Sequence, residues 1–129
     1  MGHEFSKKSE GRLSGVSPEL QAVARLAIKR SKVDFGIPET GGRRTVVRQR
    51  ELYDAGLSKC DGTTNRSNHQ DGKALDFYAY VNGKASWEPE HLAQVACAFL
   101  EAAIELGIKI KWGGLFNSFL DMPHVELYD

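Results

Sequence analysis

The sequence changes character within one stretch, 67-SNHQDGKALDFYAYVNG-83. A polar run over 58–73 ends there, and an apolar run rich in aromatic residues occupies 74–81. Asn82-Gly83 follows at once, a pair typical of tight hairpin turns. We therefore predict a strand over 74–81 and a short return strand over 84–87. The polar run is predicted to be a long loop, and loops of that length in compact domains are usually functional or disordered.

Upstream of this stretch the pattern predicts two helices separated by a short strand. Ser17-Pro18-Glu19 combines a capping hydroxyl, a first-turn proline and an early acid, and apolar residues then recur at helical spacing through 18–30. The short apolar segment 33–37 is partly β-branched and indicates a strand. Thr45 is placed to cap a second helix over 46–55.

Downstream the pattern predicts one long helix and two strands. Apolar residues mark one side of 88–106, and Gly107 is placed to end that helix. Apolar and lysine residues alternate over 108–112, which indicates a strand with one buried face. The segment 113–121 is then a loop and 123–128 a final strand. The fold class is therefore α+β, with helices packed on a mainly antiparallel sheet.

Composition bounds the architecture and the partners. A chain of 129 residues with 41% hydrophobic and 26% charged residues is expected to form a single domain over 1–129, and we expect it to act as a monomer. Lysine plus arginine equals aspartate plus glutamate at 17 each, so the overall charge does not point to nucleic acid or to an anionic membrane surface.

No apolar run approaches the roughly 20 residues that a membrane helix needs. The polar tail Met1–Gly15 lacks the features of a signal peptide, so we expect no membrane anchor and a cytoplasmic start. The two cysteines have no metal-binding spacing. Cys60 lies in the polar loop, and Cys97, among apolar helix neighbours, is expected to be a buried free thiol.

Asp76 is the most unusual residue of the chain, because aspartate is depleted in strands and this one lies between two apolar neighbours. A carboxylate in such a place needs a compensating charge or a metal ion. His69 lies seven residues upstream, and Gly72 allows the chain to turn so that the imidazole returns over Asp76. These two residues are therefore predicted to be metal ligands.

A second histidine, His124, lies at the start of the last strand, three residues after Asp121. His69, Asp76 and His124 together would make a zinc site with three protein ligands and an open fourth position, as catalytic zinc sites have. A further carboxylate must then move the proton of the attacking water, and we assign this role to Asp121. Glu126, on the same strand face as His124, is the alternative base.

The other charged and histidine residues receive ordinary interpretations. His3 lies in the polar tail and His91 in the first turn of the long helix, and neither is expected to touch the metal. The basic run Arg43, Arg44, Arg48 and Arg50 is interpreted mostly as a solvated helix face.

The pattern Ser67-x-His69-x-x-Gly72-x-Ala74-x-Asp76, followed by Asp121-x-x-His124, resembles the zinc-binding signature of the M15 peptidases. That group contains the L-alanyl-D-glutamate and D-alanyl-D-alanine peptidases. The segment from Arg44-Thr45 to Gln49 is similar to the upstream arginine segment of the family. The likeness to its short phage endolysins covers nearly the whole chain.

The resemblance implies the fold shared by Hedgehog domains and D,D-peptidases, a Zn²⁺ cofactor, and hydrolysis of a peptide bond in the peptidoglycan stem. It assigns His69, Asp76 and His124 to zinc, Asp121 to acid/base catalysis, and Arg44 to the substrate carbonyl. Asp121 stands where many relatives have glutamate, and the loop 113–121 looks shorter than in some of them.

Three functions are compatible with these residues. An endolysin would be made in the host bacterial cytoplasm, would reach the cell wall after release, and would cut L-alanyl-D-glutamate; the absence of a wall-binding domain suits a Gram-negative host. A D-alanyl-D-alanine carboxypeptidase or dipeptidase could use the same site. A catalytically silent zinc-binding module is the third, although it would be free to lose Asp121, which is present here.

Overall fold

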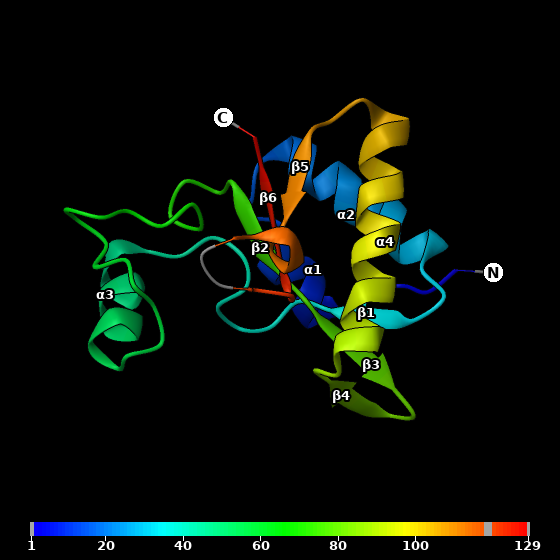
Figure 1. Ribbon diagram of the computed structural model, residues 1–129, viewed down its shortest axis with the longest axis horizontal. Helices are drawn as coiled ribbons and strands as arrows, with labels where there is room; N and C mark the ends of the chain where they lie inside the picture. Colours follow the sequence, from blue (N-terminus) through cyan, green and yellow to red (C-terminus); the bar gives the residue numbers. More distant parts are fainter. Residues whose placement is uncertain (1, 118–119, 129) are drawn as a thin grey trace.

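The computed structural model describes residues 2–117 and 120–128. Helices and strands cluster on one side of the molecule, and α3 projects from the other (Figure 1). In chain order the elements are α1 (Lys7–Leu13), α2 (Pro18–Arg30), β1 (Asp34–Gly36), α3 (Val46–Asp54), β2 (Ala74–Asp76), β3 (Tyr78–Val81), β4 (Lys84–Ser86), α4 (Pro89–Leu106), β5 (Ile110–Trp112), the 3₁₀ turn η1 (Gly113–Leu115) and β6 (His124–Leu127).

The strands form two three-stranded sheets, ordered β1-β3-β4 and β2-β6-β5, and every pair is antiparallel. The fold is α+β, which confirms the predicted class. The hairpin predicted at Asn82-Gly83 joins β3 to β4. In the second sheet, β6 lies between β2 and β5, so the last strand of the fold is the central one.

The single strand predicted over 74–81 was wrong, because the chain divides it between the two sheets at Phe77. β2 ends at Asp76 and β3 begins at Tyr78. Phe77 is fully buried, stacks on Phe99 at 5.2 Å, and donates its backbone N–H to the carbonyl of Pro123. Apart from Asp76, the residues on both sides of this point are apolar or aromatic, so the hydrophobic pattern does not mark the division.

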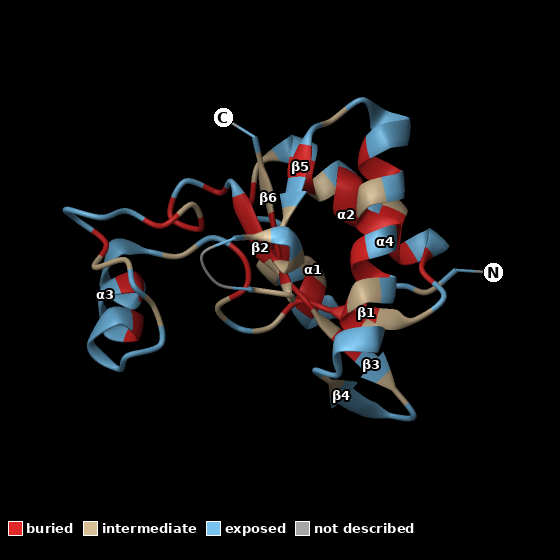
Figure 2. Cartoon of the chain, in the orientation of Figure 1, coloured by how far each residue is buried: buried red, intermediate tan, exposed pale blue. Residues whose placement is uncertain are grey.

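Two predicted helices form the helical layer of the core. α2 begins where Ser17 Oγ accepts from the Leu20 N–H, and α4 ends at Gly107 in the left-handed conformation. They pack against each other through their apolar sides (Figure 1). Figure 2 shows the buried residues along these helices and the sheets, whereas α3 is mostly exposed. No described helix combines the length and apolarity needed to cross a membrane.

The N-terminal segment is not a polar tail throughout, contrary to the prediction, because Lys7–Leu13 forms α1. Ser6 caps this helix, and Ser9 and Leu13 are its buried residues. Ser9 Oγ accepts from the backbone N–H of Ile37 at 3.0 Å. Two buried positions in seven residues are too few to produce a helical periodicity in the sequence.

Cys97 is exposed on α4, which contradicts the prediction of a buried thiol. Its neighbours Ala96 and Ala98 are buried, but the helical repeat turns Cys97 outward, with its Sγ 3.5 Å from Glu101 Oε1. Cys60 is half-buried, and both cysteines are free.

The segment predicted to be a long loop over 58–73 contains no helix or strand. Together with α3 it forms a wall beside β2. Thr45 caps α3 by accepting from the Arg48 N–H, as predicted, but only Gln49 and Leu52 of this helix are buried. The wall therefore rests mainly on polar contacts, and these converge on the residues of the site.

Candidate metal centre

Asp76 and His124 are brought together by the register of the β2–β6 pair, in which they lie directly opposite each other. Asp76 Oδ1 is 3.0 Å from His124 Nδ1 and 3.2 Å from His69 Nε2. His69 reaches this point from the loop before β2, where Gly72 adopts a φ of +71°, which side chains other than glycine rarely adopt. The turn expected at Gly72 is thus present.

His69 is held with a defined nitrogen facing Asp76. Its Nδ1 lies 3.0 Å from the carbonyl oxygen of Gly42, which can only accept, so Nδ1 carries the hydrogen. The lone pair of the neutral ring is then on Nε2, the atom next to Asp76. The imidazole is almost completely buried, and its backbone N–H donates to Ser67 Oγ.

His124 is oriented in the same manner by a carboxylate. Its Nε2 is 2.8 Å from Glu126 Oε1, and the other oxygen of Glu126 accepts from Asn68 Nδ2 at 3.1 Å. Burial alone would lower the pKa of His124, but its hydrogen bonds to Asp76 and Glu126 raise that pKa to about 9. When no metal ion is bound, His124 is therefore protonated and positively charged at neutral pH.

Asp76 is ionised in this setting. Burial alone would raise its pKa, but the hydrogen bonds from His124 and His69 hold the pKa of this carboxyl well below its usual range. Its second oxygen, Oδ2, is 3.2 Å from Arg44 Nη2. Asp76, the carboxylate that stood out in an apolar strand, thus has a positive group next to each of its two oxygens.

The chemistry of the three donors fits a zinc ion. One donor atom each from His69, Asp76 and His124 lies within 4.8 Å of the others. The separations of 3.0 and 3.2 Å from Asp76 Oδ1 are close to the roughly 3.3 Å between neighbouring tetrahedral ligands with bonds of about 2.0–2.1 Å. Each histidine also has the outer hydrogen-bond acceptor that metal-binding histidines usually have.

Asp121 lies next to these donors without belonging to the group. Its Oδ2 is 3.7 Å from His124 Nδ1, and its side chain is 38% exposed. Burial raises the pKa of Asp121. Its backbone N–H donates to the carbonyl of Gly113, where a Cβ atom would collide with the backbone of Asp121, so glycine is needed there.

Arg44 is inserted into the site from the segment before α3, not from the exposed face of that helix. Its Nε donates to the carbonyl of Thr40 at 2.8 Å, and its Nη1 donates to Gln49 Oε1 at 3.2 Å. Its side chain is only 11% exposed. Of the basic run, Arg48 and Arg50 do form exposed ion pairs on α3, as predicted.

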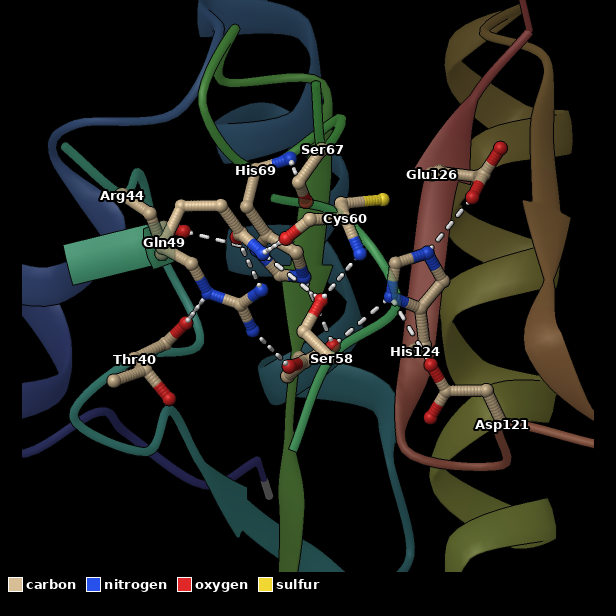
Figure 3. Close-up of polar contacts among 12 residues, drawn as sticks. Thr40, Arg44, Gln49, Ser58, Cys60, Ser67, His69, Asp121, His124 and Glu126 are labelled. Carbon is tan, nitrogen blue, oxygen red and sulfur yellow. Dashed lines mark hydrogen bonds and ion pairs between the residues drawn. The ribbon is translucent and has the colours of Figure 1, made fainter. Parts of the chain in front are cut away.

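Gln49 is a site residue for which the sequence pattern held no independent signal. It is completely buried, and besides accepting from Arg44 it donates from Nε2 to Ser58 Oγ and to the carbonyl of Cys60, both at 2.8 Å (Figure 3). Gln49 thus links Arg44 to the wall. A buried glutamine on a short, mostly polar helix resembles any surface residue in sequence.

These side chains face a cavity of about 530 Å³ between the wall and β6. Phe116 closes part of it, with its ring 6.0 Å from that of His124. His91 and His3 lie elsewhere: His91 contacts Ser86, and His3 lies 4.0 Å from Asp34. The lining includes Arg44, Ser58, Cys60, Arg66, His69, Asp76, Phe116, Asp121, His124 and Glu126.

Comparisons with known proteins agree with one another. The family model for phage L-alanyl-D-glutamate peptidase matches residues 1–128. The L-alanyl-D-glutamate peptidase of Escherichia phage T5 is 40% identical over 119 residues, which cover 92% of this chain and 85% of that protein. The crystal structure of the L-Ala D-Glu endopeptidase ChiX from Serratia marcescens superposes with a TM-score of 0.85 at 41% identity, covering 98% of this chain and 91% of ChiX.

Proposed function

The chain belongs to the phage L-alanyl-D-glutamate peptidase family, and from this membership we propose that it cuts the bond between L-alanine and D-glutamate in the peptidoglycan stem, using the cavity beside β6. It is a peptidase that acts on peptidoglycan, and its fold is that of a known L-Ala D-Glu endopeptidase. The position of the cut bond and the roles of individual residues are the proposed parts.

One observation carries the assignment of the site: the donor atoms of His69, Asp76 and His124 converge within 4.8 Å, and all three residues line the cavity of about 530 Å³. We propose that they hold Zn²⁺, because two imidazoles and one carboxylate are a common set of catalytic zinc ligands. A zinc ion held there would supply Lewis acidity for the attacked carbonyl and for the attacking water.

Asp121 is proposed as the acid and base of the reaction. Its Oδ2 would take the proton from the attacking water and deliver it to the nitrogen of D-glutamate as the peptide bond breaks. Two features support this role: Asp121 lies beside the donor group, and its pKa is raised. Glu126 is the weaker candidate, because its two oxygens are already engaged by His124 and Asn68.

Arg44 is proposed to bind the carbonyl oxygen of the cut bond. A guanidinium has five N–H groups, and three of them are used by Thr40, Gln49 and Asp76. Two N–H groups therefore remain for negative charge that develops on the carbonyl oxygen. The same side chain holds Asp76 by its second oxygen, so it also orients a proposed metal ligand.

Several features of the setting also belong to the proposal. We expect residues 1–129 to act as one domain and as a monomer. The protein would be made in the host cytoplasm and would meet its substrate, the stem peptide, at the cell wall.

The test is digestion of purified Gram-negative sacculi by the zinc-loaded protein, with the products identified by mass spectrometry. The proposal expects peptides that begin with a free D-glutamate amine. Release of terminal D-alanine alone would identify a carboxypeptidase instead. Asp121→Ala, prepared in parallel, controls for contaminating hydrolases, because it changes only the proposed acid and base.

A further inference from the structure

A second cavity of about 390 Å³ adjoins the proposed active site. The two cavities share Arg44 and Arg66 in their linings, so they are neighbours. Its lining consists of Arg43, Arg44, Thr45, Val46, Arg66 and Gln70. Three of these residues carry a guanidinium group, and none of the lining residues is acidic.

The three arginines differ in how far their charge is already used. Arg44 is committed to Asp76 inside the fold. Arg43 donates from Nε to the neutral carbonyl of Gln70 at 3.3 Å, and no ion pair joins it to any other described residue. Its terminal N–H groups can therefore donate hydrogen bonds to a carboxylate from outside.

Arg66 already binds a carboxylate, but at the surface. Its Nη2 is 2.6 Å from Asp71 Oδ1, and the two side chains are 53% and 42% exposed. An ion pair so exposed contributes little to stability and exchanges readily with a competing partner. The guanidinium of Arg66 can thus bind a carboxylate of the substrate beside Asp71 or in its place.

The substrate is asymmetric in charge about the cut bond, given the proposed function on which this inference rests. The alanine side contributes a methyl group and a neutral carbonyl. D-Glutamate contributes the leaving nitrogen and keeps at least one free carboxylate when its other carboxyl continues the peptide. The two halves of the substrate therefore need surroundings of different charge.

The main cavity offers two such surroundings. Asp121 and Glu126 lie on the β6 side, where a second carboxylate would be repelled. Arg44 and Arg66 also line the main cavity, and the same two residues line the neighbouring arginine-lined space. Guanidinium groups bind carboxylates through paired hydrogen bonds, which fixes both position and direction.

We propose that Arg43 and Arg66 form a carboxylate subsite, which binds the free carboxylate of D-glutamate on the leaving side of the cut bond. The subsite selects the acidic substrate and sets the direction in which the stem peptide lies across the metal donors. It is a specificity determinant and takes no part in the chemical step.

The test compares two synthetic stem peptides that differ at one group, the free carboxylate of D-glutamate in one and the corresponding amide in the other. The zinc-loaded parent, Arg43→Gln, Arg66→Gln and the double variant are assayed on both peptides. Arg48→Gln is the matched control, because Arg48 is an exposed arginine on α3 that lines neither cavity.

The parent is expected to favour the carboxylate peptide by about tenfold to a hundredfold in kcat/KM, the span of a charged hydrogen bond. The double variant should lose that preference by slowing on the carboxylate peptide alone, whereas Arg48→Gln should retain it. Equal rates of the parent on both peptides, or equal losses on both in the variants, would overturn the subsite and leave the proposed function standing. Failure of the parent to cut either peptide would overturn both.

Discussion

Asp76 and His124 face each other across the antiparallel β2–β6 pair, and Asp76 Oδ1 lies 3.0 Å from His124 Nδ1. Their distance is therefore set by backbone register and not by loop conformation. A slip of one residue in this pairing would turn His124 to the opposite face of the sheet and remove it from the site. The remaining donor, His69, is positioned by the loop before β2. The three donors should therefore differ in how far their positions tolerate changes in the surrounding backbone.

Removing either histidine donor should abolish metal binding. The purified protein is expected to carry about one zinc per chain, and His69→Ala or His124→Ala should lose both zinc and activity, because two protein ligands hold the ion poorly. Metal analysis of each variant measures this. His91→Ala, which removes a histidine outside the site, should keep both. Full zinc in the first two variants would contradict the ligand assignment.

Asp121 should be required for chemistry but not for the metal. Asp121→Ala should bind zinc and unfold much like the parent, while hydrolysis slows by roughly a hundredfold or more, the usual span of general acid/base catalysis. Zinc content and rate are to be measured on one preparation. Loss of zinc would make Asp121 a ligand, whereas full activity would transfer the role of base to Glu126.

Glu126 should act through His124. Because Glu126 Oε1 fixes the hydrogen on His124 Nε2, Glu126→Gln should weaken zinc binding by about 10–100-fold, as changes to the outer partners of metal ligands usually do. Competition with a chelator measures this affinity. At saturating zinc the rate should recover, and that recovery separates an orienting carboxylate from a base. A rate that stays low with the site fully loaded would favour the base role.

Gln49 should matter because it positions Arg44. Gln49→Ala removes the hydrogen bonds that Gln49 makes to Arg44 Nη1, Ser58 Oγ and the Cys60 carbonyl in a buried place, and should cost about 1–3 kcal/mol in free energy of unfolding. Turnover should fall as well. In a double-mutant cycle, Arg44→Ala with Gln49→Ala should be little slower than Arg44→Ala alone, because both act through one side chain. If the losses in rate were additive, Gln49 would not act through Arg44.

The metal-free protein should lose stability in mild alkali. Burial opposes the charge on His124, but its hydrogen bonds to Asp76 and Glu126 raise the pKa to about 9 from 6.5. A raised pKa in the folded state contributes stability that is complete below about pH 6.5 and is lost as the pH rises through about 9. Thermal melts of chelator-treated protein at pH 6.5 and 9 measure the loss. His124→Gln should remove most of the difference between the two pH values.

The helices were predictable wherever a cap and an apolar stripe coincided, as for α2 and α4. α1 was not, because two buried residues in seven make no visible stripe. The extended segment over 74–81 was placed correctly in the chain, yet its division at Phe77 was not predictable, because apolar or aromatic residues occur on both sides of Phe77. The sheet that each strand joins is decided by residues that are distant in sequence.

The site was predictable to the extent that its residues looked out of place. Asp76 in an apolar strand needed a partner, and its separation from His69 suggested one. Gln49 and Arg66 carried no such mark, because a polar side chain on a polar segment is ordinary. Their significance comes from the folding of the wall, which buries Gln49 and aims Arg66 into two cavities.

The central place of β6 in its sheet has a consequence for the timing of activity. His69 and Asp76 leave the ribosome well before His124, which follows Asp76 by 48 residues. The growing chain can form α2 and its early contacts while it has only two of the three donors. The gap between β2 and β5 is filled only when the final strand has been made. The nascent enzyme should thus be inactive as a peptidase during translation, and it would bind the metal ion only once folding is complete.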